Sequence, residues 1–274
     1  MQHISGRLKR WTLAILPSLA CIGAAAAQVP PPPFGPNLGS PGGKAPQLAP
    51  VGRQASSELL YKPIAPCRAF GGQLVATNQI KAFLVSGNSN FTAQGGPSGG
   101  CGIPAYAKAV SISLSSGTSG AQGYLTAYAT GSARPNQASL SYGVNPATTG
   151  SIVQLGTGGR INVLATAATR VTGDIAGYFV EPIQGMISSN GVDIYSGSTG
   201  LVSSTLPTMG VYRVVVDRDV SYCTPVATPY YGPNLYANAY AFDGNVVTVY
   251  TWYIDHSANA TKPINTYVYL AVHC

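Results

Sequence analysis

Four cysteines constrain most strongly how this chain can fold. Once an N-terminal leader is set aside, the cysteines that remain are Cys67, Cys101, Cys223 and Cys274. An even number of cysteines in an exported chain predicts disulfide bonds rather than free thiols. Three pairings are open, and pairing Cys67 with Cys101 and Cys223 with Cys274 keeps each bridge local. Each such bridge would close a loop of some tens of residues, worth roughly 3–4 kcal/mol in the chain-entropy description.

A metal site is the alternative use of these cysteines. Zinc sites place their ligands at short spacings such as Cys-x-x-Cys, and the sequence contains neither that spacing nor His-x-x-x-His. The only histidines after the leader are His256 and His273. We therefore expect no bound metal and no other cofactor.

The first 27 residues have the features of a secretory signal peptide. The basic segment MQHISGRLKR precedes the apolar run WTLAILPSLACIGA, and an Ala-x-Ala cleavage site ends at Ala27. Because Pro17 interrupts this short run, no membrane span is expected in the mature chain. The alternative is a lipoprotein anchored through Cys21, but Ser18 stands where a lipobox requires a branched apolar residue. The chain is expected to be secreted or held at the cell surface.

Residues 28–57 are rich in Pro and Gly and contain few side chains that could form a core. This composition predicts an extended linker without a folded structure of its own. The formal net charge of +7 includes three basic residues of the leader, which leaves +4 on the mature chain. The remaining Lys and Arg are scattered singly, so we expect no binding to nucleic acid.

Short runs with β-branched or alternating apolar residues fill the rest of the chain. In residues 108–115, Val110, Ile112 and Leu114 occupy every second position, which is typical of a strand with one buried face. Gly, Asn, Pro and Ser separate the runs at short intervals, as in an antiparallel sandwich. The predicted strands lie within residues 79–86, 108–115, 123–130, 138–144, 151–156, 160–166, 171–179, 210–220, 234–255 and 266–274. Residues 234–255 are predicted to form a long hairpin with Asp243 and Gly244 at its tip.

The predicted fold is therefore all-β, with two disulfide-stapled antiparallel β-sandwich-like domains. Pro182 and Gly185 mark the boundary between a domain at 58–181 and a second domain at 182–274. No stretch after the leader has sustained helical periodicity.

Two segments resemble modules of exported bacterial proteins. PIAPCR, FTAQGGPSGGCGIPAYAKAVSI, GYLTAYATG and the closing DIAGYF occur in order over residues 61–179 and are similar to an uncharacterised secreted β module. Members of that family often have Asp-Thr-Arg soon after the first cysteine, where this chain has Ala69, Phe70 and Gly71, so no role of that acidic-basic pair is carried over. GVYRVVVDRDVSYCTPVAT and the final YLAVHC resemble a C-terminal domain of exported proteins. The resemblance implies secreted β modules and brings no established chemistry.

The second predicted domain is rich in tyrosine. Eleven of the seventeen tyrosines follow residue 182, and Trp252 is the only tryptophan outside the leader. Exposed aromatic rings favour contact with glycans or proteins, whereas the alternative is ordinary half-buried strand tyrosines. The residues proposed for a binding patch within 230–253 are Tyr230, Tyr231, Tyr236, Tyr240 and Trp252.

Catalytic residues find little support in the sequence. Asp217 and Asp219 are two residues apart on a predicted strand and would share a face, as a glycosidase pair or a Ca²⁺ site would. The plainer interpretation is a strand end near Arg213 and Arg218. His256 lies between Asp255 and Ser257, but neighbours on an extended chain point to opposite sides.

We therefore expect a non-enzymatic secreted or cell-surface module that acts by protein or glycan contact, as an adhesin or an extracellular assembly component. One alternative is a hydrolase of cell-wall or matrix polysaccharide that uses Asp217, Asp219 and Asp255. A third is a structural subunit that forms a homo-oligomer.

Overall fold

The computed structural model describes residues 58–274; the predicted signal peptide, the cleavage site at Ala27, the lipid-anchor alternative at Cys21 and the linker at 28–57 lie outside these residues. The described chain consists of strands β1–β16 and one short 3-10 turn. All strand pairs are antiparallel, which confirms the all-β prediction. Residues 58–274 contain no helix that is long and apolar enough to cross a membrane.

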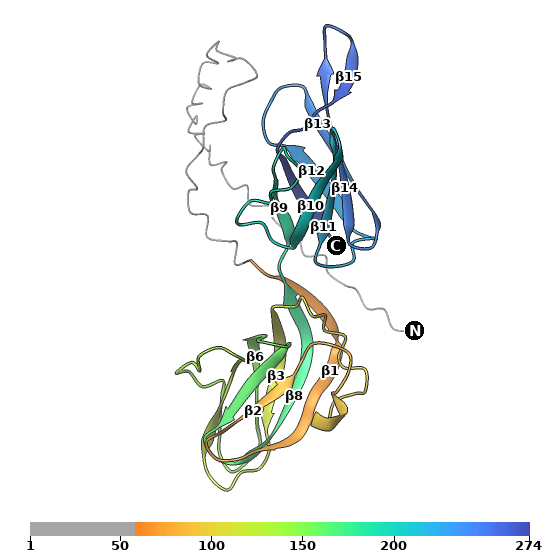
Figure 1. Ribbon diagram of the computed structural model, residues 1–274. Helices are drawn as coiled ribbons and strands as arrows, with labels where there is room; N and C mark the ends of the chain where they lie inside the picture. The colour runs from red at the N-terminus through yellow and green to blue at the C-terminus, as the bar shows by residue number, and fades with distance from the viewer. Residues whose placement is uncertain (1–57) are drawn as a thin grey trace, which may run out of the picture. The chain divides into compact units, whose positions relative to one another are not determined.

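Strands β1–β8 form two four-stranded sheets, here called the N-terminal sandwich (Figure 1). The first sheet contains, in order, β1 (Leu60–Val75), β8 (Thr169–Val180), β3 (Ala109–Ser116) and β6 (Ala147–Gln154). The second contains β2 (Gln79–Leu84), β7 (Arg160–Ala165), β4 (Gly123–Ala129) and β5 (Leu140–Tyr142).

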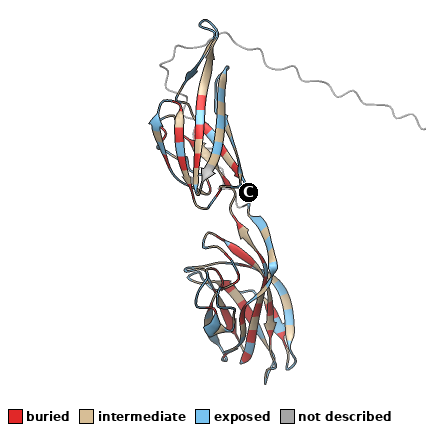
Figure 2. Cartoon of the chain, turned by 90° about the vertical axis from the view of Figure 1, so that its right-hand side faces the viewer, coloured by how far each residue is buried: buried red, intermediate tan, exposed pale blue. Residues whose placement is uncertain are grey.

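The core of the N-terminal sandwich is built from the alternating apolar residues of both sheets. Val110, Ile112 and Leu114 are buried, as their period-two spacing predicted. Phe70 of β1 stacks on Phe83 of β2 with ring centroids 4.0 Å apart, so the two sheets meet through these rings. Figure 2 shows the resulting bands of buried and exposed residues along the strands.

Strands β9–β16 form the C-terminal sandwich. Its larger sheet contains β10 (Leu201–Thr208), β11 (Val211–Val216), β14 (Val246–Asp255) and β13 (Leu235–Asp243), with β15 (Ala260–Pro263) paired to β14. Its smaller sheet contains β12 (Thr224–Pro229), β16 (Val268–His273) and β9 (Ile183–Ile187). A separate cluster of buried apolar residues between 183 and 272 fills the space between these sheets.

Tyr212 ties the two sheets of the C-terminal sandwich together. Its ring is completely buried, and its hydroxyl donates to the carbonyl oxygen of Thr266 at 2.7 Å and accepts from the Thr266 amide at 2.8 Å. Burial raises the pKa of the Tyr212 phenol above its ordinary value, so the hydroxyl stays protonated and keeps its donor role. The segment before β16 is thereby fixed to β11.

Both predicted disulfides are present. Cys67 of β1 is bonded to Cys101 in the loop before β3, with Cα atoms 5.6 Å apart. Cys223 precedes β12 and is bonded to Cys274 after β16, so that bridge closes the end of a strand pair in which Thr224 lies opposite His273. The local pairing expected from the sequence is therefore confirmed.

Strands that contain proline all lie at sheet edges. The strands in question are β1, β10, β12 and β15, each of which has a sheet neighbour on one side only. Proline has no N–H to donate, so an edge position costs no ladder hydrogen bond. In β1 the register also shifts between Pro63 and Cys67, where a bulge accommodates Pro66.

The β13–β14 hairpin was predicted with Asp243 and Gly244 at its tip. In the structure Asp243 pairs with Val246, so the two loop residues are Gly244 and Asn245. Gly244 has a φ of 57°, which a residue without Cβ adopts most easily. The hairpin prediction is confirmed, and the turn lies one residue later than expected.

Gln94 joins the two sheets of the N-terminal sandwich at an edge. Its amide nitrogen donates to the carbonyls of Ala69 (2.8 Å) and Leu84 (2.6 Å), and its oxygen accepts from the Leu84 amide at 2.9 Å.

We expect Gln94→Ala to lower the free energy of unfolding by about 2 kcal/mol, because three backbone groups lose their hydrogen bonds to the Gln94 side chain. Hydrogen exchange of the Leu84 amide measures the effect directly. The matched change Thr92→Ala, on the same turn, should leave that rate unchanged, and equal rates in both variants would contradict this role.

Candidate functional site

The outer side of the β13–β14 hairpin presents the most distinctive group of exposed side chains. Five residues, here called the aromatic face, project from this side: Tyr236, Asn238, Tyr240, Tyr250 and Trp252. Tyr236 lies opposite Trp252 and Asn238 lies opposite Tyr250 in the strand register. The rings therefore form two adjacent rows on a hydrogen-bonded scaffold.

Strict alternation along the two strands explains why the rings are exposed. Ala237, Ala239 and Ala241 point inward from β13 and pack against the core, and Val247 and Val249 do the same from β14. Successive side chains of a strand point to opposite sides of the sheet. Tyr236, Tyr240 and Tyr250 accordingly keep 44%, 41% and 41% of their surface exposed.

Ring contacts and small inward residues hold the aromatic face in shape. Tyr240 and Tyr250 make an edge-to-face contact with centroids 5.9 Å apart, a geometry favoured by the ring quadrupoles.

Two open hollows flank Tyr250 and Trp252. One, of about 430 Å³, is lined by Asn238, Tyr240, Tyr250 and Trp252. The other, of about 260 Å³, extends from the same two rings to Gly210, Val211 and the β15 residues Thr261–Pro263.

The hollows contain almost no charge. Lys262 is the only ionisable group other than tyrosine in their linings, and its Nζ lies 2.7 Å from Oδ2 of Asp255. This contact raises the pKa of the Lys262 amine and, with hydrogen bonds from Ser257 and Ala258, lowers the pKa of the Asp255 carboxyl. Both groups remain charged and compensate each other at neutral pH.

Tyr230 and Tyr231, which were predicted to belong to the same patch, lie elsewhere. Tyr230 packs against Tyr269 and Tyr267, at centroid distances of 5.6 and 6.2 Å, on the outer side of the smaller sheet. Tyr195 contacts Tyr267 there, and hydrogen bonding to Tyr267 raises the pKa of Tyr195. Tyr231 is exposed in the loop before β13. The prediction of one contiguous aromatic patch over residues 230–253 is therefore wrong, because the chain passes from one sheet to the other between β12 and β13.

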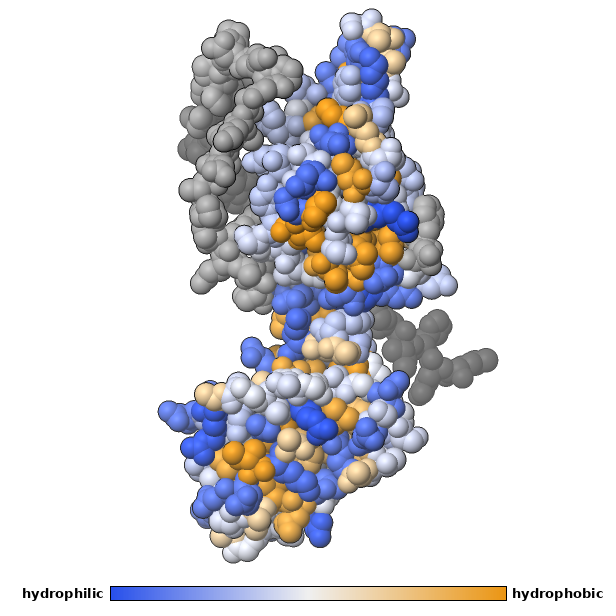
Figure 3. All heavy atoms as spheres, viewed as in Figure 1, coloured by the Kyte–Doolittle hydropathy of each residue, from blue (hydrophilic) through white to orange (hydrophobic). Residues whose placement is uncertain are grey.

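Tyr250 belongs to the aromatic face but was not among the predicted binding residues. The signal was available, because Tyr250 and Trp252 are two residues apart and a strand places both on one side. Hydropathy gives no such signal. On the side shown in Figure 3, hydrophilic and hydrophobic residues are interspersed over both sandwiches.

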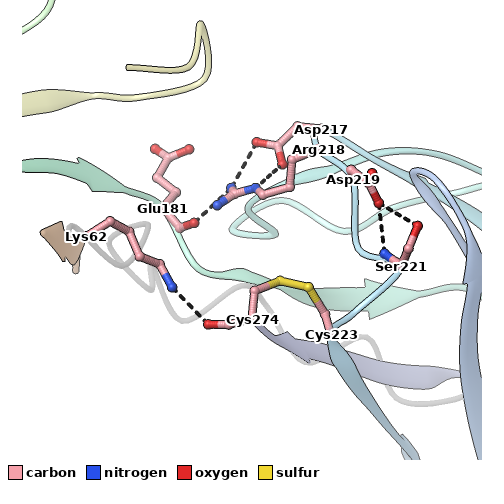
Figure 4. Close-up of a disulfide and its surroundings, with 8 residues drawn as sticks. All are labelled: Lys62, Glu181, Asp217, Arg218, Asp219, Ser221, Cys223 and Cys274. Carbon is pink, nitrogen blue, oxygen red and sulfur yellow. Dashed lines mark hydrogen bonds and ion pairs between the residues drawn. A yellow bond between two sulfur atoms is a disulfide. The ribbon is translucent and has the colours of Figure 1, made fainter. Parts of the chain in front are cut away.

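Asp217 and Asp219 do not share a strand face, because β11 ends at Val216. Asp217 makes two hydrogen bonds to the Arg218 guanidinium, at 2.7 and 3.1 Å, and Arg218 also donates to the carbonyl oxygen of Glu181 (Figure 4). Asp219 accepts hydrogen bonds from the amide and hydroxyl of Ser221, which lower its pKa. Both carboxylates thus stabilise the turn that leads to Cys223.

Asp255 lies at the other end of the larger sheet. Residues 216 and 245 mark one end of the β11–β14 pair, whereas Asp255 lies beyond Tyr250, the partner of Val211 at the opposite end. The three aspartates of the hydrolase alternative are therefore not gathered in one place. Within residues 58–274, no three His, Cys, Asp or Glu side chains are grouped to hold a metal ion.

Comparison with known proteins adds no functional assignment. The resemblance of residues 61–179 and of the C-terminal segment to secreted bacterial modules therefore remains a prediction. No family model, no curated protein and no solved structure matches the chain.

Proposed function

We propose that this protein is a non-enzymatic module, secreted or held at the cell surface, that acts by contact with an extracellular partner. Its role would be that of an adhesin or of a component of an extracellular assembly. The aromatic face of β13–β14 is the observation that supports this proposal most strongly. Two disulfides are also typical of a chain that works in an oxidising compartment.

Aromatic side chains suit contact because they present a large area with few rotatable bonds. On this hairpin their positions are fixed by strand pairing and by inward-packed alanines, so little conformational entropy is lost when a partner binds. A row of rings exposed on the outer side of a sheet is a candidate for an interaction surface.

Two triple variants would test the proposal. The first replaces Tyr236, Tyr240 and Tyr250 by threonine and removes three of the four rings of the aromatic face. The matched control replaces Tyr195, Tyr230 and Tyr269, which are 42%, 43% and 43% exposed on the same sandwich. Threonine retains strand propensity at the strand positions 236, 240, 250 and 269, and Tyr195 and Tyr230 lie in loops, so both variants should fold.

Retention of fluorescently labelled protein on bacterial cells and isolated extracellular matrix would be measured for both variants. We expect the aromatic-face variant to bind at least about 30-fold more weakly than the unmodified chain, because contact hot spots are worth about 2 kcal/mol or more. The control variant should bind normally. Equal losses in the two variants, or none in either, would contradict the proposal.

A further inference from the structure

We propose that the partner of the aromatic face is a neutral polysaccharide chain that lies across Tyr250 and Trp252. This inference rests on the proposed function and adds to it the chemical class of the ligand. The shape of the surface, the groups that line it and its charge each point to this class.

The shape favours a chain over a compact ligand. Small-molecule sites are concave cavities of about 300–1,000 Å³ that enclose most of their ligand. Here two open hollows of about 430 and 260 Å³ lie side by side and share Tyr250 and Trp252. A polymer can occupy both hollows with consecutive units and leave one side in solvent.

The lining groups match the two kinds of surface that a sugar ring presents. The C–H groups on one side of a pyranose are apolar and pack on the side chains of Tyr and Trp, whereas its hydroxyls need hydrogen-bond partners. Asn238 supplies an amide between the rings of Tyr236 and Tyr240 on β13, and Thr261 supplies a hydroxyl at the edge of the second hollow. An amide both donates and accepts, as hydroxyl recognition requires.

The charge argues for a neutral ligand. Single-stranded nucleic acid also stacks on aromatic rings, but its sites add a positively charged groove. In the hollows described above, Lys262 is compensated by Asp255. Arg213 is on the same side of the sheet, one strand away, opposite Thr248 and outside both linings. A single peripheral cation is insufficient to hold a polyanion.

The test uses residues 28–274, in which Trp252 is the only tryptophan. Its fluorescence would be titrated with neutral polymers (soluble cellulose and chitin oligomers, mannan and laminarin) and with anionic ones (alginate and heparin). We expect at least one neutral polymer to change the emission of Trp252 with saturable binding that varies little with salt. Tyr250→Thr should weaken this binding about tenfold, Tyr250→Phe should retain it, and the matched Tyr269→Thr should have no effect.

Two results would overturn the inference. One is preferential binding of alginate or heparin that weakens with salt; the other is no binding of any neutral polymer. If cells or matrix still bind in a manner that depends on the aromatic face, the inference alone fails and the partner is a protein or a polyanion. If that dependence is also absent, the proposed function fails with it.

Discussion

Replacing Cys223 and Cys274 together by alanine is expected to lower the free energy of unfolding of the C-terminal sandwich by about 4 kcal/mol. The bridge spans 51 residues, and its loss restores the corresponding loop entropy to the unfolded chain. Domains are often stable by only about 5–15 kcal/mol, so a large part of the stability of this small sandwich would be lost. Because β16 is the central strand of the smaller sheet, its detachment would also release β9 and β12.

Guanidinium unfolding followed by the fluorescence of Trp252 measures this change, because Trp252 belongs to the same sandwich. The matched control is the double replacement of Cys67 and Cys101, which removes the other bridge. That variant should leave the Trp252 transition at its original midpoint. A Trp252 midpoint that moves equally in both variants would contradict the separate stapling of the two sandwiches.

Phe70→Ala is expected to cost the N-terminal sandwich about 3–5 kcal/mol, the usual range for a large buried ring. Phe70 is completely buried, stacks on Phe83 and covers Gly173, whose missing side chain leaves room for the ring. Its removal opens a cavity between the sheets at the point where β1 meets β8. Hydrogen exchange of the β8 amides would report the loss.

Leu74→Ala on the same strand is the matched control, because Leu74 is 55% exposed. It should change the exchange of β8 by less than about 0.5 kcal/mol. If both variants exchanged alike, Phe70 would not be the contact that holds these sheets together.

Most of the fold prediction rested on the alternation of apolar and polar residues along the chain. Strands with one apolar face, such as β3 with Val110, Ile112 and Leu114, were predicted because their side chains repeat every two residues. The local disulfide pairing followed from cysteine number and position. These signals are local. An apolar residue favours the core and a polar residue favours solvent, whatever the order of the strands in the sheet.

The strands that sequence reasoning missed are mostly edge strands. β10, β12 and β15 contain proline, and so does β1, with Pro63 and Pro66. Proline normally argues against a strand, and only the sheet order reveals that these strands need no second neighbour. Sheet order is a tertiary property, so single-sequence patterns do not provide it.

The aromatic face was predictable only in part, again because the sequence pattern does not provide the sheet order. The alternation of side chains along β13 places Tyr236 and Tyr240 on one side of the sheet. The position of Tyr230 depends on where the chain leaves one sheet for the other.

Asp217 and Asp219 were placed on a strand because the run from 210 to 220 has no obvious end. Their turn-stabilising contacts with Arg218 and Ser221 are what end it.

Hydroxyl-radical footprinting of residues 28–274, with and without the cells or matrix that they bind, tests the central claim most directly. The account predicts that oxidation of Tyr236, Tyr240, Tyr250 and Trp252 falls on binding, while that of Tyr195, Tyr230 and Tyr269 is unchanged. Protection confined to the smaller sheet or to the N-terminal sandwich, with the four rings of the hairpin as reactive as before, would contradict it.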